Sequence, residues 1–228
     1  MAGQGRPDPA ADLAGFTARL VERPGDDAAR EGRARALLAL GRLAEAEADA
    51  AHAVRLDPDE VRYRELLAEI QSRRGEHSDA AAEYARLARN DPRQVAWTLA
   101  EATERIESAD AAGGIDAARR ALRLAPDSFD AQLALARGLI RLGDPPAAQA
   151  AAKRAADLRP SSPAARETLA DALWLADRAG LAFDEFRLLA DELSGPDRER
   201  VLAKARSLYR GHAGWLGRRA ASDRKSVV

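Results

Sequence analysis

The chain has 228 residues, a formal net charge of −1 at pH 7 and no cysteine. The near-neutral charge excludes a global field that would gather nucleic acid or an anionic membrane, and the lack of cysteine excludes disulfides and thiol chemistry. Hydrophobic residues make up 46% of the chain but aromatic residues only 4%, so alanine supplies much of the apolar content. That composition suits closely packed helices better than a β-sandwich or barrel.

The N-terminal part is predicted to be disordered over 1–9 and to form a capping helix within 10–26. Its apolar residues, Leu13, Phe16 and Leu20, share one helical face. Pro24 stops the helix. The first nine residues lack the hydrophobic stretch of a signal peptide. No apolar run reaches the roughly 18–20 residues that a membrane span needs. These features predict a cytoplasmic protein.

A 34-residue period organises most of the chain. Prolines recur at that spacing, at Pro24, Pro58, Pro92, Pro126 and Pro160. One column of small residues holds Ala34, Ala68, Ala102, Ala136 and Ala170, and a second holds Ala46, Ala80, Gly114, Ala148 and Ala182. Small residues let helix axes approach, proline stops a helix, and a glycine halfway along ends the first helix. These glycines are Gly41, Gly75 and Gly143.

This pattern resembles the tetratricopeptide repeat, a helical hairpin with small residues at positions 8 and 20 and proline at position 32. Numbered from Asp27, five repeats are predicted, at 27–60, 61–94, 95–128, 129–162 and 163–196. The resemblance implies an all-α fold, a right-handed superhelical solenoid of antiparallel helix pairs with capping helices at both ends.

The third repeat departs from the family pattern. Its positions 7 and 11 are Glu101 and Arg105, and a Gly-Gly pair falls where the second helix should begin. Because glycine inside a helix costs roughly 1 kcal/mol relative to alanine, we expect a longer turn over about 108–114 and a second helix from Ile115. Position 4, usually tryptophan in the family, holds Arg30, Arg64, Thr98, Gln132 and Arg166.

A stop and restart follows the fifth repeat, where Gly195 and Pro196 are adjacent. A capping helix is predicted over 197–210, with apolar residues at helical spacing: Val201, Leu202, Ala205, Leu208 and Tyr209. The remainder, 211–228, is expected to be a flexible basic tail.

No combination of residues indicates catalysis. The three histidines, His52, His77 and His212, share no metal-ligand spacing and are expected to be solvated. The chain has no glycine-rich phosphate loop, nucleophile elbow or dinucleotide fingerprint. We therefore expect a protein that is not an enzyme and uses neither a metal nor a cofactor.

The resemblance places function in a concave groove lined by the first helix of each repeat. The groove residues it implies are Arg35, Leu38, Leu66, Glu69, Arg73, Leu99, Thr103, Ile106, Leu133, Arg137, Ile140, Arg141, Asp171 and Trp174. The lysine and asparagine set that clamps a peptide C-terminus in some family members is missing. An apolar strip flanked by charges favours a partner peptide with apolar anchors and mixed charge.

The apolar strip has a second interpretation. Leu99 and Leu133 are as well explained by the core between repeats as by a groove, and Trp174 is expected to pack beneath the C-terminal helix. The favoured function is a non-catalytic scaffold or adaptor that holds a protein or peptide partner of unknown identity. Two alternatives stay open: self-association into a homo-oligomer, and docking of the basic tail on nucleic acid or an anionic surface. The strong bias of arginine over lysine suggests a bacterial source.

Overall fold

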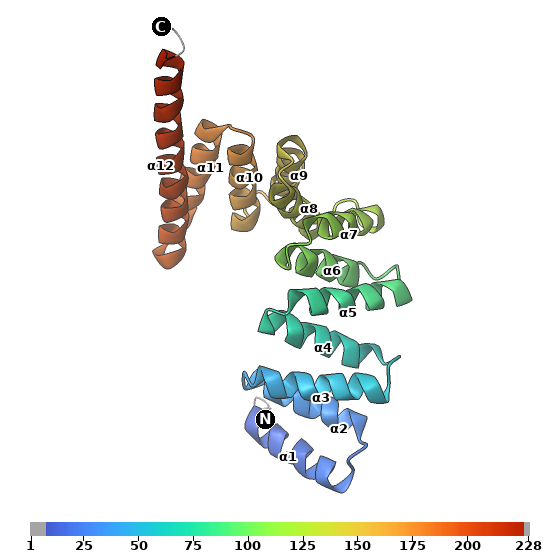
Figure 1. Ribbon diagram of the computed structural model, residues 1–228. Helices are drawn as coiled ribbons and strands as arrows, with labels where there is room; N and C mark the ends of the chain where they lie inside the picture. Colours follow the sequence, from blue (N-terminus) through green and yellow to red (C-terminus); the bar gives the residue numbers. More distant parts are fainter. Residues whose placement is uncertain (1–7, 226–228) are drawn as a thin grey trace, which may run out of the picture. The chain divides into compact units, whose positions relative to one another are not determined.

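The computed structural model describes residues 8–225, and side chains over 8–210. Within these residues the fold is all-α, as predicted, with twelve helices that pack in sequential antiparallel pairs (Figure 1). None of the helices in the described range is long and apolar enough to cross a membrane. The predictions for 1–7 and 226–228 lie outside the described residues.

The chain divides after Pro126 into two compact units. The first contains α1 (Pro9–Glu22), α2 (Asp27–Ala39), α3 (Leu43–Leu56), α4 (Val61–Arg74), α5 (His77–Asn90), α6 (Val95–Glu107) and α7 (Ala111–Leu124). The second contains α8 (Phe129–Leu142), α9 (Pro145–Leu158), α10 (Pro163–Leu175), α11 (Ala179–Glu192) and α12 (Gly195–Lys225). Within each unit every helix packs against the next one in the chain.

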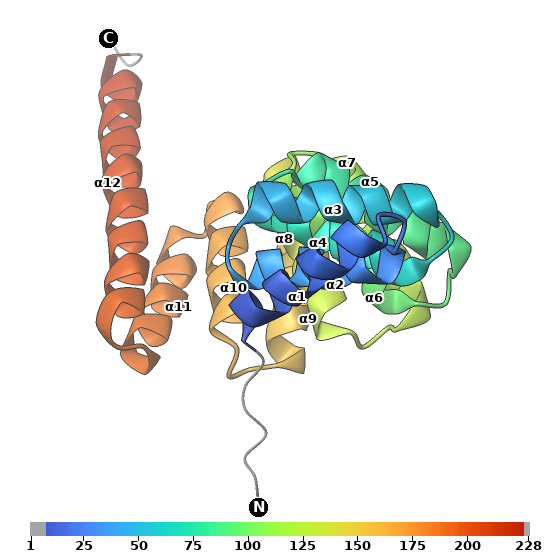
Figure 2. The ribbon, with the colours of Figure 1, turned by 90° about the horizontal axis from the view of Figure 1, so that it is seen from below.

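The first unit has two layers of helices. Figure 2 shows α3, α5 and α7 on one side of this unit and α2, α4 and α6 on the other. The layers meet at the two columns of small residues, and the five alanines that these columns place in this unit are fully buried. The absence of a bulky side chain at these points lets the helix axes approach, as the period predicts.

Short polar side chains and left-handed turns set the helix ends. The Asp26 carboxylate accepts a hydrogen bond from the Ala29 N–H at 2.8 Å, and this bond satisfies an otherwise free donor in the first turn of α2. Three of the turns between the helices of a repeat contain a glycine with φ between 73° and 80°, as predicted: Gly41, Gly75 and Gly143. Ala109 and Asp177 take the same left-handed conformation in the third and fifth repeats, with φ of 67° and 57°.

The prediction for the third repeat was wrong. α7 begins at Ala111, so the turn is as short as in the other repeats and both glycines lie inside the helix. The Asp110 carboxylate fixes the first turn by accepting a hydrogen bond from the Gly113 N–H at 2.9 Å. A Cβ at Gly114 would lie 2.5 Å from Cγ1 of Ile106, so the glycine is required for α6 and α7 to approach.

The C-terminal helix is longer than expected. α12 extends from Gly195 to Lys225, whereas we expected a helix over 197–210 followed by a flexible tail. Residues 211–225 contain three glycines but no proline. Each glycine costs a helix roughly 1 kcal/mol, which good helix formers among the other residues offset, whereas a proline would cost about 3 kcal/mol.

Candidate functional site

The predicted apolar groove residues of the first unit are mostly core. Leu38 and Leu66 belong to one buried cluster with Leu37 and Ile70, which joins α2, α3 and α4. Ile106 on α6 is 2% exposed. Leu99, one turn from the start of α6, is half-buried. The structure therefore leaves Leu99 as the more accessible apolar member of the predicted set in this unit.

The charged groove residues of the first unit are accessible and paired. Arg35 lies 2.8 Å from the Glu31 carboxylate, and Arg73 lies 2.8 Å from Glu69. Each pair spans one helical turn, and the arginine side chains are more than half exposed. The Arg73–Glu69 pair is exposed on both sides and contributes about 0–1 kcal/mol to stability, whereas the Glu31 carboxylate is buried and only Arg35 is accessible to a ligand.

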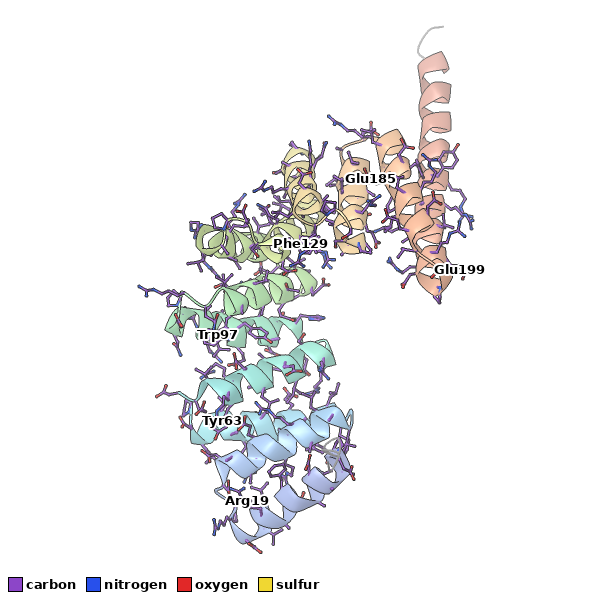
Figure 3. The ribbon with its side chains drawn as sticks, turned by 180° about the vertical axis from the view of Figure 1, so that it is seen from behind. Arg19, Tyr63, Trp97, Phe129, Glu185 and Glu199 are labelled. Atoms are coloured by element: carbon purple, nitrogen blue, oxygen red, sulfur yellow. The ribbon has the colours of Figure 1, made fainter. Side chains whose placement is uncertain are left out.

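Aromatic side chains mark the N-terminal ends of α4 and α6. Figure 3 labels Tyr63 on α4 and Trp97 on α6. The indole N–H of Trp97 donates a hydrogen bond to the Glu65 carboxylate on α4 at 2.5 Å, which ties the first helices of two successive repeats together. Burial raises the pKa of Tyr63 to about 12, so its hydroxyl stays protonated.

In the second unit, α8 provides the accessible groove residues. Leu133 is buried in a cluster with Phe129, Ala155 and Ala165, which supports its interpretation as core. Arg137 and Arg141 are exposed and Ile140 is half-buried. An arginine pair therefore flanks a partly exposed apolar side chain on this helix.

The groove positions on α10 are occupied by α12. Arg200 donates two hydrogen bonds to Glu167, both at 2.9 Å. Lys204 donates to Glu167 at 2.9 Å and to Asp171 at 2.7 Å. The bonds from Arg200, joined by Lys204, lower the pKa of Glu167 to about 2. Burial raises the pKa of Asp171 despite its bond to Lys204.

Trp174 lies on α10, the helix that also carries Glu167 and Asp171. Its ring is half-buried and meets the Phe183 ring edge to face, with centroids 6.1 Å apart. Phe183 makes a second edge-to-face contact with Tyr209 of α12, at 5.3 Å. Three aromatic side chains from α10, α11 and α12 are thus connected, which is the arrangement expected of a core-facing tryptophan.

The arginines at position 4 have a role that the sequence analysis missed. Each donates a hydrogen bond to the carbonyl of the proline six residues earlier: Arg30 to Pro24 at 2.6 Å, Arg64 to Pro58 at 2.9 Å and Arg166 to Pro160 at 3.3 Å. Each also lies within ion-pair distance of a carboxylate on the second helix of its own repeat. The signal was present in the sequence as arginine at three of the five residues that occupy position 4.

We expected His77 to be solvated, but the structure places it beside a carboxylate. Its Nδ1 lies 2.8 Å from one carboxylate oxygen of Glu104, and the Ser72 hydroxyl donates to the other oxygen at 2.7 Å. His52 lies beside Arg55 on α3. His212 lies beyond the described side chains. Among the described residues no group of histidine and carboxylate side chains has the arrangement of a metal site.

Comparison with known proteins identifies the family. Models of the tetratricopeptide repeat match residues 2–59, 32–95 and 129–172. The chain belongs to the tetratricopeptide repeat family, whose repeats are generally protein–protein interaction modules. No curated protein matches the chain.

Solved structures support the same fold. A tetratricopeptide repeat protein from Parabacteroides merdae is 16% identical with a TM-score of 0.77, over 96% of this chain and 85% of that one. A thermophilic tetratricopeptide repeat protein from Thermus thermophilus is 18% identical with a TM-score of 0.60, over 80% of this chain and 98% of that one. YrrB, described as having an unusual peptide-binding site, is 15% identical with a TM-score of 0.63, over 85% of this chain and 99% of that one.

Proposed function

We propose that this chain is a non-catalytic scaffold or adaptor that binds a partner peptide or helix on the groove face of its repeats. In the first unit this face is formed by α2, α4 and α6, and in the second unit it is formed by α8. The observation that carries the proposal is the accessibility of charged groove residues around half-buried apolar ones. Arg35 and Arg73 are exposed in the first unit, and Arg137 and Arg141 flank Ile140 in the second.

The partner is best described as a peptide of mixed charge. Leu38, Leu66 and Ile106 are buried, so they offer little apolar surface to a ligand. The accessible groups are guanidiniums and carboxylates, which recognise a partner by charge-assisted hydrogen bonds. The peptide-binding site described for YrrB, a structural relative, supports a peptide as the class of ligand.

Asp171 and Trp174 are the predicted groove residues on α10, the helix that α12 contacts. Asp171 already binds Lys204 of α12, so a ligand on α10 would have to displace that helix. We therefore propose binding at α2, α4 and α6 within the first unit and at α8 within the second, each unit by itself, and assign α10 to holding α12.

Selection from a peptide library displayed on phage, followed by fluorescence anisotropy with the selected peptides, tests the proposal. Arg35→Glu with Arg73→Glu probes the first unit, and Arg137→Glu with Ile140→Asp probes the second. Losing an exposed charge pair to a ligand costs about tenfold in affinity, and charge reversal costs more. Arg119→Glu on α7, outside the groove face, is the control and should leave binding unchanged.

Two results would contradict the proposal. One is a library that enriches no sequence. The other is binding that survives both groove variants while their circular dichroism matches the wild type. Deletion of 211–228 in parallel separates groove binding from docking through the C-terminal segment, and light scattering of the wild type separates it from self-association.

A further inference from the structure

The first unit contains a pocket on the other side of α6. It lies among α5, α6 and α7, has a volume of about 500 Å³, and is lined by four arginines, Arg89, Arg105, Arg120 and Arg123. On α6 the lining residues are Thr98, Glu101 and Arg105. At 100° per residue these three lie roughly 150° around the helix from the groove residues Leu99 and Thr103. The α5–α7 pocket is therefore distinct from the groove face.

The pocket lies in the third repeat, which has no arginine at position 4. In the first, second and fifth repeats that arginine donates a hydrogen bond to the proline carbonyl. The third repeat has Thr98 instead, a buried side chain that is too short to reach the carbonyl of Pro92. Pro92 lines the pocket, and the space that an arginine would fill stays open.

The charges around the pocket are unbalanced. Glu101, 3% exposed, accepts hydrogen bonds from Arg105 at 2.9 Å and Arg120 at 2.5 Å. Arg105 also donates to Asp110 at 2.7 Å. Four guanidiniums against these two carboxylates leave two positive charges, and arginine does not lose its proton in proteins.

The excess charge is carried by Arg89 and Arg123. The two arginines are one repeat apart, on α5 and α7, and both side chains are exposed. Neither has a hydrogen-bond or ion-pair partner among the described residues, so neither must give up a partner to bind a ligand. Held on α5 and α7 at one pocket, they form two planar donors of the kind that bind carboxylate groups in bidentate fashion.

We infer that the α5–α7 pocket binds an acidic segment of a protein partner, with Arg89 and Arg123 taking its carboxylate side chains. The remaining walls include Ala85, Ala88 and Leu124, which suit the methylene groups of glutamate. A nucleic acid fits less well, because a phosphate backbone needs an extended basic track. The arginine column of Arg55, Arg89 and Arg123 turns acidic in the next two repeats, at Asp157 and Asp191.

Fluorescence anisotropy with the full chain tests this inference. The probe is a short fluorescein-labelled peptide of alternating glutamate and alanine, and glutamine replaces glutamate in its matched control. The glutamate peptide should bind at least about tenfold more tightly than the control peptide. Arg89→Gln with Arg123→Gln should remove this preference without affecting the fold, because neither side chain has a partner among the described residues.

A charge-matched variant separates the pocket from general electrostatics. Arg55→Gln with Arg119→Gln removes the same charge from α3 and α7 outside the pocket, and should leave affinity within about twofold. Thr98→Arg restores the residue found in the first, second and fifth repeats, and should abolish binding by filling the pocket although it adds a positive charge.

Three results would overturn the inference. Equal affinity for the two peptides would show that carboxylates are not recognised. Unchanged or tighter binding by Thr98→Arg would show that the pocket is not the site. Binding of a labelled single-stranded oligonucleotide that depends on Arg89 and Arg123, with no binding of the glutamate peptide, would assign the site to nucleic acid instead.

Discussion

Ala109 holds a backbone conformation that alanine adopts at a cost. Its φ of 67° is close to that of the turn glycines Gly41, Gly75 and Gly143. The left-handed conformation costs a residue with a Cβ roughly 1–2 kcal/mol, and glycine avoids that cost. Glycine also loses more chain entropy on folding, and this cost offsets part of the free energy gained by removing the strain.

Ala109→Gly should therefore stabilise the first unit by about 0.5–1 kcal/mol. Urea denaturation followed by circular dichroism measures the change. Ala112→Gly, inside α7, is the matched control and should destabilise by roughly 1 kcal/mol. Equal destabilisation by both variants would mean that the turn at Ala109 is not strained.

Gly114→Ala tests the close approach of α6 and α7 by adding a Cβ where the two helices meet. Helix propensity alone favours alanine by roughly 1 kcal/mol. A Cβ at this position, however, would lie 2.5 Å from Cγ1 of Ile106 and 3.0 Å from the Ala102 carbonyl oxygen. Overpacking of this kind costs about 1–3 kcal/mol, so we expect a net destabilisation of up to about 2 kcal/mol in thermal or urea unfolding.

Gly180→Ala is the control for that substitution, because a Cβ there meets nothing within 4 Å. It should stabilise α11 by about 0.5–1 kcal/mol. If both alanine variants stabilise the protein, α6 and α7 have room to separate, and close approach is not the reason for glycine at position 114.

Single residues also show how far the sequence predicts the site. The small-residue columns were predictable because each alanine recurs every 34 residues. The burial of Leu38 and Leu66 could not be predicted, because it depends on how closely α2 and α4 pack. The sequence period identifies the face of each helix but gives no information on that distance. Glycine propensity also misled at Gly114, where packing between two helices outweighs the preference of one.

At the scale of helices, α12 is held to α10 by ionic contacts that acid should remove. The pKa of Glu167 is about 2, below its ordinary value of 4.5, because Arg200 and Lys204 bind the charged form. A lowered pKa contributes stability that is complete above pH 4.5 and is lost as pH falls toward 2. The raised pKa of Asp171 acts in the opposite direction, since its protonation relieves the cost of burying the charge.

Glu167→Gln should cost about 1 kcal/mol at pH 7, an amount reduced by the partial exposure of the pair. The cost should shrink between pH 4.5 and pH 2, where wild-type Glu167 becomes protonated. Amide hydrogen exchange in α10 and α12 at several pH values reports it. A difference between variant and wild type that is the same at both ends of this pH range would contradict the ionic origin of the contact.

At the scale of the whole molecule, the two compact units give the chain two cores. Phe186, 1% exposed, packs with Leu189 and Val201 in the core of the second unit. The first unit has its own cluster around Leu37 and Ile70. Stability in repeat proteins is a sum of local terms, so damage to one core need not reach the other.

Phe186→Ala should destabilise the second unit by about 3–5 kcal/mol. Amide exchange should accelerate in α8 to α12 and stay unchanged in α1 to α6. Leu188→Ala, an exposed neighbour on the same helix, is the control and should have little effect. A uniform loss of protection from α1 to α12 would show that the chain unfolds as one cooperative body.

The hydrogen bond from each position-4 arginine to a proline carbonyl has a consequence for how such chains are recombined. The donor belongs to one repeat and the acceptor to the end of the segment before it, six residues earlier. A repeat excised at the start of its first helix would carry the arginine but leave the proline behind. Duplication or exchange of modules in this protein should therefore use a cut ahead of the proline, so that donor and acceptor are inherited together.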